Sequence, residues 1–123
     1  MRITRIHQVG ANLVDLEETK AFYTNALGAR YIADFDPPGI LFFEFAGTRI
    51  LFEKGNPPAV LYFWVDDIDD AHATLVNRGV QFDSDPHLIH RDDSGTFDNP
   101  GTEEWMAFFK DPGGNTIAIA TRR

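Results

Sequence analysis

The sequence predicts an α+β fold made of two copies of one βαβββ module. Residues 6–29 and 60–80 share one order: an apolar run, an aspartate, an amphipathic stretch and a glycine. Aromatic-rich segments with the alternation of β-strands follow both copies. Because the same features recur in the same order, we interpret the chain as a duplication. The residues that mark the start and the stop of the two helices are Asp15, Gly28, Asp67 and Gly79.

In the first copy, residues 3–13 are predicted to form a strand whose alternate side chains face opposite sides. One set, which includes His7, is expected to lie beneath the first helix, with His7 half-buried beside it. The other set, which includes Gln8 and Asn12, is expected to line an open face. The helix should begin at a capping aspartate, with Glu18 three residues later as in a capping box.

Three strands are expected next, at residues 30–35, 40–46 and 49–53, with turns at 36–39 and 47–48. Regular alternation predicts an antiparallel sheet with one buried face and one semi-polar face. The semi-polar face would carry Phe42, Glu44, Arg49, Leu51 and Glu53.

The second copy begins after a short hinge, GNPP at residues 55–58. Strands are expected at 60–65, 80–83, 105–110 and 116–120, and a helix at 67–78. Residues 86–102 lack periodicity, so we expect a long loop that acts as a lid or lines a cleft. Turn chemistry alone accounts for DPGGN at residues 111–115.

Length and charge set the limits on function. The 123 residues suit one domain spanning 1–123, with module one at 1–55, the hinge at 55–58 and module two at 59–123. There is no cysteine, so thiolate metal sites and disulfides are excluded. The formal charge of −8 argues against a nucleic acid partner, and no apolar run is long enough for a membrane span. No signal-peptide core is present, so a cytoplasmic location is expected.

Three motifs carry a likeness to a known family: VDLEETKAFYTNALG at 14–28, VDDIDDAHATLVNRGV at 65–80 and FFKDPGGN at 108–115. Together with the repeated βαβββ order, they resemble the vicinal oxygen chelate superfamily. That family includes glyoxalase I, methylmalonyl-CoA epimerase, fosfomycin- and bleomycin-resistance proteins and extradiol dioxygenases. The resemblance covers the whole chain and implies that the two modules form an incomplete barrel around a concave cleft.

The resemblance also implies four slots for the ligands of a divalent metal. Counted from the motif aspartates, the first slot falls on Gln8 and the third on Val60. The last falls on Ala118, and the second falls near Leu51, with Glu53 on the same face. Valine and alanine have no lone pair to donate, and a catalytic metal normally needs about three protein ligands. No cofactor is therefore expected, and a divalent metal is disfavoured.

The open face is the predicted ligand-binding cleft, because aromatic walls with a few polar groups suit a small molecule. An alternative interpretation is a dimer surface, and both can hold. Glu44 and Glu53 are candidates for a general acid–base pair; the alternative is that Arg49 pairs with one of them. The predicted cleft residues are Gln8, Asn12, Phe42, Arg49, Leu51, Tyr62, Trp64, Trp105 and Met106.

A relocated metal site at His87 and His90 with Glu103 or Glu104 is a further alternative, although histidines three apart point opposite ways on a strand. The preferred interpretation is a pair of solvent-facing loop histidines.

We therefore expect a homodimeric protein that binds a small organic molecule in an aromatic cleft, like the bleomycin-resistance proteins. The alternative is an enzyme: a metal-dependent or carboxylate-based lyase or isomerase, similar to lactoylglutathione lyase or an epimerase. The sequence leaves open whether a reaction is catalysed and which ligand is bound.

Overall fold

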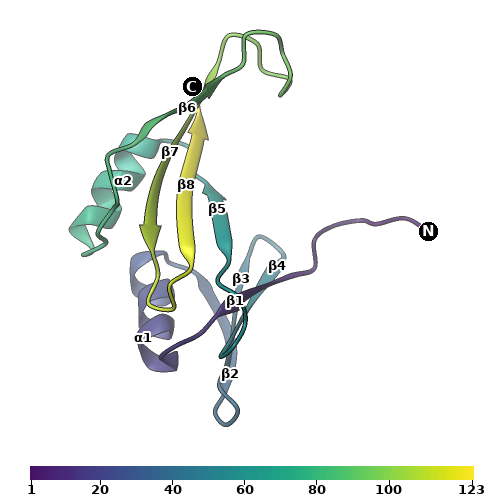
Figure 1. Ribbon diagram of the computed structural model, residues 1–123, viewed down its shortest axis with the longest axis vertical. Coiled ribbons are helices and arrows are strands. Elements are labelled where there is room, and N and C mark those ends of the chain that lie inside the picture. Colours follow the sequence, from purple (N-terminus) through teal and green to yellow (C-terminus); the bar gives the residue numbers. More distant parts are fainter. The chain divides into compact units, whose positions relative to one another are not determined.

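The computed structural model describes all residues, 1–123, and divides into two compact units (Figure 1). The first unit comprises residues 1–59 and 111–115, and the second comprises 60–110 and 116–123. Each unit holds one four-stranded mixed sheet and one helical segment between its first two strands. The predicted α+β fold with two βαβββ modules is confirmed. Neither helix is long and apolar enough to cross a membrane.

In the first unit, the strands lie in the order β1-β4-β3-β2, with β1 parallel to β4 and the other pairs antiparallel. The helical segment packs on one face of this sheet, where the ring of Tyr23 lies 4.7 Å from that of Phe52 and 5.6 Å from that of Phe43. Those three side chains are fully buried. The bounds of the elements are β1 Gln8–Asn12, α1 Leu16–Ala21, η1 Phe22–Ala26, β2 Arg30–Phe35, β3 Ile40–Phe45 and β4 Thr48–Glu53.

The second unit repeats this arrangement, with the order β5-β8-β7-β6 and a parallel pair formed by β5 and β8. Figure 1 shows β8, in yellow, between β5 and β7. The core of the unit contains Ile68 and Leu75 of the helix and Phe109, Ile117 and Ile119 of the sheet. The bounds of the elements are β5 Val60–Trp64, α2 Ile68–Asn77, β6 His87–Arg91, β7 Glu103–Lys110 and β8 Thr116–Arg122.

The helix starts follow the sequence prediction. The side chain of Asp15 accepts a hydrogen bond from the backbone N–H of Glu18 at 2.8 Å, and Asp67 accepts one from Asp70 at 3.1 Å. These bonds satisfy N–H groups that a helix leaves free at its start. The first helix continues from α1 into η1, a π-helical turn that the 3.6-residue pattern did not predict.

Three predictions about the elements are wrong. The first strand begins at Gln8, and the residues before it are exposed, so His7 does not lie beneath the helix. Residues 80–83 form no strand; Phe82 makes only an isolated bridge to Phe109. The strand that completes the second sheet is instead β6, inside the segment predicted to be a loop.

Candidate functional site

The open face of the first sheet is the one opposite its buried face. Leu41 and Phe43 of β3 are fully buried and Ile50 of β4 nearly so, whereas the residues between them are partly exposed. Alternation therefore puts the predicted cleft residues of this sheet on its open side. Cross-strand pairing aligns them in rows, with Gln8 beside Arg49 and Asn12 beside Glu53. The open-face residues of β1, β3 and β4 are Gln8, Asn12, Phe42, Glu44, Arg49, Leu51 and Glu53.

Arg49 is the centre of a polar cluster on this face. Its Nε and Nη2 donate to the side-chain oxygen of Gln8 at 3.0 and 2.7 Å. Its Nη2 also donates to Nε2 of His7 at 3.2 Å, and its guanidinium carbon lies 5.4 Å from the ring centroid of Phe42. The sequence prediction placed His7 on the wrong side, because the residue precedes the strand and does not follow its alternation. The cluster fixes the guanidinium over the open face.

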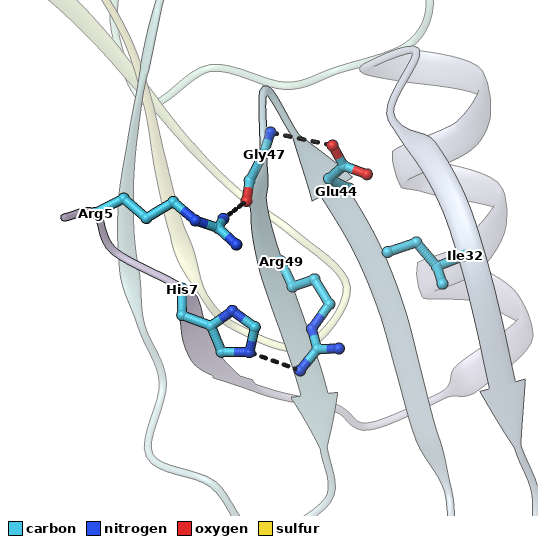
Figure 2. A pocket seen from close by; sticks show the side chains of 6 residues that line it. All are labelled: Arg5, His7, Ile32, Glu44, Gly47 and Arg49. Carbon is cyan, nitrogen blue, oxygen red and sulfur yellow. Dashed lines mark hydrogen bonds between the residues drawn. The ribbon is translucent and has the colours of Figure 1, made fainter.

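A hollow of about 530 Å³ lies at this end of the face, within the size range of small-molecule sites. In Figure 2, Arg5 and His7 flank Arg49 on one side, and Glu44 and Ile32 flank it on the other. Arg5 donates to the carbonyl oxygen of Gly47. The sequence prediction missed Arg5 and Ile32. The residues that line the hollow are Arg5, His7, Ile32, Glu44, Gly47 and Arg49.

The structure contradicts the prediction that Glu44 and Glu53 form an acid–base pair. Glu44 lies opposite Arg49 and Glu53 lies opposite Ile40, so the two rows are four positions apart along β3. At about 3.3 Å per residue this is roughly 13 Å along the strand, so the two carboxylates are not neighbours on the open face. The alternative that Arg49 pairs with one of them is also wrong: Glu44 forms its ion pair with Arg30 and accepts a hydrogen bond from the N–H of Gly47.

The second sheet has an aromatic open face of its own. Tyr62 and Trp64 of the edge strand β5 are 59% and 60% exposed. Trp64 lies in the same cross-strand row as Ala120 and Met106. Met106 therefore shares their face, as predicted.

Trp105 does not belong to this open face, which corrects the prediction. It lies two residues before Ala107 and four before Phe109 on the same strand, so all three side chains point to the buried side of the sheet, opposite the open face. Its ring lies 4.5 Å beneath the guanidinium carbon of Arg123, and its N–H donates to Glu103 at 3.2 Å. The side chain of Trp105 is thus held at the start of β7 by its contacts with Arg123 and Glu103.

A β-bulge in β6 places both histidines of the predicted alternative metal site on one face. The pairing register shifts between Leu88 and His90, so His87 lies opposite Met106 and His90 lies opposite Glu104. The carboxylate of Glu104 is bound to Arg122 at 3.3 Å. Within neither unit do three His, Asp or Glu side chains form a group that could hold a metal ion.

Residues of the DPGGN turn make buried hydrogen bonds to distant parts of the first unit. The sequence interpretation, in which turn chemistry alone accounts for this motif, is therefore wrong. Asp111 is buried, and its Oδ2 accepts hydrogen bonds from the hydroxyl of Tyr23 at 2.6 Å and from the side-chain amide of Asn115 at 2.8 Å. The fully buried Asn115 also bonds to both backbone groups of Asn12, at 3.0 and 2.8 Å. The turn therefore fixes the end of β1, and with it the strand that presents Gln8.

Burial and the adjacent charge strongly perturb Tyr23. Burial raises the pKa of its hydroxyl first, and the negative charge of Asp111 and the hydrogen bond to it raise the pKa further. The hydroxyl therefore stays protonated as a donor throughout the physiological range.

Asp92 organises the loop between β6 and β7, the part of the predicted long loop that has no strand. Its Oδ2 accepts hydrogen bonds from the N–H groups of Phe97 at 3.0 Å and Asn99 at 3.2 Å. Burial tends to raise the pKa of this carboxyl group, but backbone N–H groups led by that of Asn99 hold the pKa below its usual value. The loop is thus built around a buried carboxylate.

The residues at three of the four metal slots of the resemblance do not fit a divalent ion. Of the residues at the first, third and last slots, only Gln8 has a side-chain atom that could bind a metal. That oxygen already accepts two hydrogen bonds from the guanidinium of Arg49. An amide oxygen has two lone pairs, so both are engaged. Ala118 is fully buried and Val60 is 53% exposed, and neither has a ligand atom.

Comparison with known proteins identifies the family. The family model described as the glyoxalase/bleomycin resistance protein/dioxygenase superfamily matches residues 5–119. The chain belongs to this superfamily. A search of curated proteins found no significant match.

Solved structures of this superfamily's fold cover nearly the whole chain. An integron cassette protein from the mobile metagenome of V. cholerae has 23% sequence identity and a TM-score of 0.74, over 98% of this chain and 97% of that one. A lactoylglutathione lyase from Agrobacterium tumefaciens has 16% identity and a TM-score of 0.73, over 98% and 95%. TnmS3, an antibiotic binding protein from Streptomyces sp. CB03234, has 25% identity and a TM-score of 0.74, over 97% and 96%.

Proposed function

We propose that this superfamily member binds a small organic molecule on the open face of its first sheet and does so without a divalent metal. The observation that carries the proposal is the double hydrogen bond from Arg49 to the side-chain oxygen of Gln8. A metal ion at Gln8 would have to break this bond and come close to a fixed guanidinium charge. The repulsion between the two cations would oppose binding.

The chemistry of the faces supports binding of a small molecule. Phe42 and Leu51 on the open face of the first sheet offer apolar and stacking surface. Arg49 adds a polar group that is held in one orientation. Orientation by a few polar groups among apolar walls is the usual design of such sites. The resemblance to an antibiotic binding protein supports sequestration as the role.

The protein is also proposed to be a homodimer. The side chains of Tyr62 and Trp64 leave apolar area exposed on the edge strand β5, and exposed aromatic area often marks an interface. Sedimentation equilibrium at increasing protein concentration gives the mass directly. A mass that stays at 13.9 kDa throughout would contradict the dimer.

Calorimetric titration with a panel of aromatic compounds, with and without EDTA, tests the binding proposal. We expect at least one compound to bind with the same affinity in both buffers, because no metal takes part. The same preparation should leave hemithioacetals and acyl-CoA epimers unchanged. Turnover of either substrate, or binding that disappears with EDTA, would favour a metal-dependent lyase or isomerase. Failure of every compound to bind would reject the proposed function.

A further inference from the structure

We propose that the hollow lined by Arg5 and Arg49 binds an oxyanion of the ligand, so that the natural ligand is an organic acid. This inference rests on the proposed function and adds the chemical class of the ligand. The group recognised is a carboxylate or a phosphate joined to an apolar body.

Charge within the hollow is the first reason. Neither Arg5 nor Arg49 forms an ion pair with a carboxylate within the first unit. The only acidic residue that lines the hollow is Glu44, and Arg30 already neutralises it. The hollow thus carries two uncompensated positive charges on a chain whose formal charge is −8. Such a local positive field attracts an anion and disfavours a cation.

The remaining hydrogen-bond donors are the second reason. A guanidinium has five N–H groups, and the bonds of Arg49 to Gln8 and His7 use only those on Nε and Nη2. Its Nη1 makes no hydrogen bond within the first unit. Arg5 uses one nitrogen to bind the carbonyl of Gly47. Hydrogen bonds therefore hold both guanidinium groups in place and leave N–H groups free to bind an oxyanion. A carboxylate or phosphate matches the planar, forked geometry of a guanidinium.

Apolar surface beside the charges is the third reason. Ile32, which is 41% exposed, lines the hollow at the β-bulge of β2. Phe42 lies below the guanidinium of Arg49, and the exposed ring of Phe35 meets Phe42 edge-on at 6.4 Å. A free inorganic anion would leave this surface in water. An acid with an aromatic or aliphatic body would cover it.

Binding of three matched probes tests the inference: 1-naphthoate, its neutral analogue 1-naphthamide, and 1-naphthyl phosphate. Calorimetry on the full chain should show that at least one of the two anions binds about tenfold or more tightly than the amide, the effect of one charge-assisted hydrogen bond. The Arg49→Met variant should lose this preference. Arg5→Met should reduce it, and Arg2→Met, which removes the same charge from the exposed N-terminal segment, should keep it.

The outcomes separate this inference from the proposed function. Equal affinity for the amide and both anions would overturn the oxyanion site but leave small-molecule binding intact. An anion preference that survives both Arg49→Met and Arg5→Met would also overturn it, because another group would then hold the anion. Whichever anion binds more tightly identifies the acid as a carboxylate or a phosphate. If Arg49→Met does not fold, Arg49→Lys keeps the charge without the planar fork and should retain only part of the preference.

Discussion

Replacing Tyr23 with phenylalanine tests how the buried turn is held. The change deletes one oxygen atom and its hydrogen bond of 2.6 Å to Asp111, whose carboxylate keeps three other donors, from Gly113 and Asn115. A hydrogen bond to a charged group contributes roughly 1.5–3 kcal/mol, so we expect a loss of about 2 kcal/mol in the free energy of unfolding. With an unfolding entropy of about 0.26 kcal/mol/K for a chain of this length, Tm should fall by about 8 °C.

The pH dependence of the same pair gives a second, independent readout. Because the folded state raises the pKa of Tyr23, the stability that its protonated hydroxyl contributes is fully present below the unfolded pKa of about 10. Above that pH the wild type should lose about 1.4 kcal/mol per pH unit from this residue, and Tyr23→Phe should lose none. The two stabilities should therefore converge about one and a half pH units above 10.

Urea unfolding followed by circular dichroism between about pH 7 and pH 12 measures both effects. Tyr62→Phe is the matched control, because the same atom is removed from an exposed ring, and we expect it to change stability by less than about 0.5 kcal/mol. Equal stability of Tyr23→Phe and wild type at pH 7, or parallel curves above pH 10, would refute the role assigned to the hydrogen bond.

Three further predictions follow from single contacts. Gly113→Ala should lower the free energy of unfolding by about 1–3 kcal/mol in urea titrations, because its Cβ would lie 2.4 Å from the carbonyl oxygen of Asn12; unchanged stability would mean that the turn is not so closely packed. Asp92→Asn should lower Tm at pH 7, because the folded state lowers the pKa of Asp92 and its carboxylate therefore stabilises the fold above the unfolded pKa. In the wild type this stability is lost as the pH falls, so the Tm of Asp92→Asn should depend less on pH in the acid range. A melting curve at pH 3 that separates the two proteins as widely as at pH 7 would contradict this. Arg30→Met should weaken binding of the preferred naphthyl anion, most strongly at low salt, because it leaves the charge of Glu44 uncompensated; unaltered calorimetric affinity would show that Glu44 does not act on the hollow.

Strong local patterns explain what the sequence predicted well. The capping aspartates and the glycines at the helix ends act within one turn, so their effect is visible in a short window. Strand β2 was predicted with the bounds Arg30–Phe35 that the structure has, and alternation assigned the buried and open residues of β3 and β4. A repeated local pattern was also enough to predict the two modules.

The features that escaped prediction depend on distant partners or on broken periodicity. All five residues of β6 are exposed, and its bulge interrupts the period of two, so neither hydrophobicity nor alternation marks it as a strand. His7 precedes β1 and does not follow the alternation of a strand, so its side chain can contact Arg49. The buried contacts of Asp111 with Tyr23 span 88 positions of sequence. A turn motif alone carries no sign of such a partner.

The metal content of the protein tests the central claim most directly. Chain purified without chelator from a medium supplemented with Zn, Ni, Mn and Fe should contain far less than one ion per chain by elemental analysis, because Arg49 engages both lone pairs of the Gln8 oxygen. Gln8→Ala should leave the metal content unchanged. One ion per chain in the wild type that disappears in Gln8→Ala would contradict the proposal and place this protein among the metal-dependent members of its superfamily.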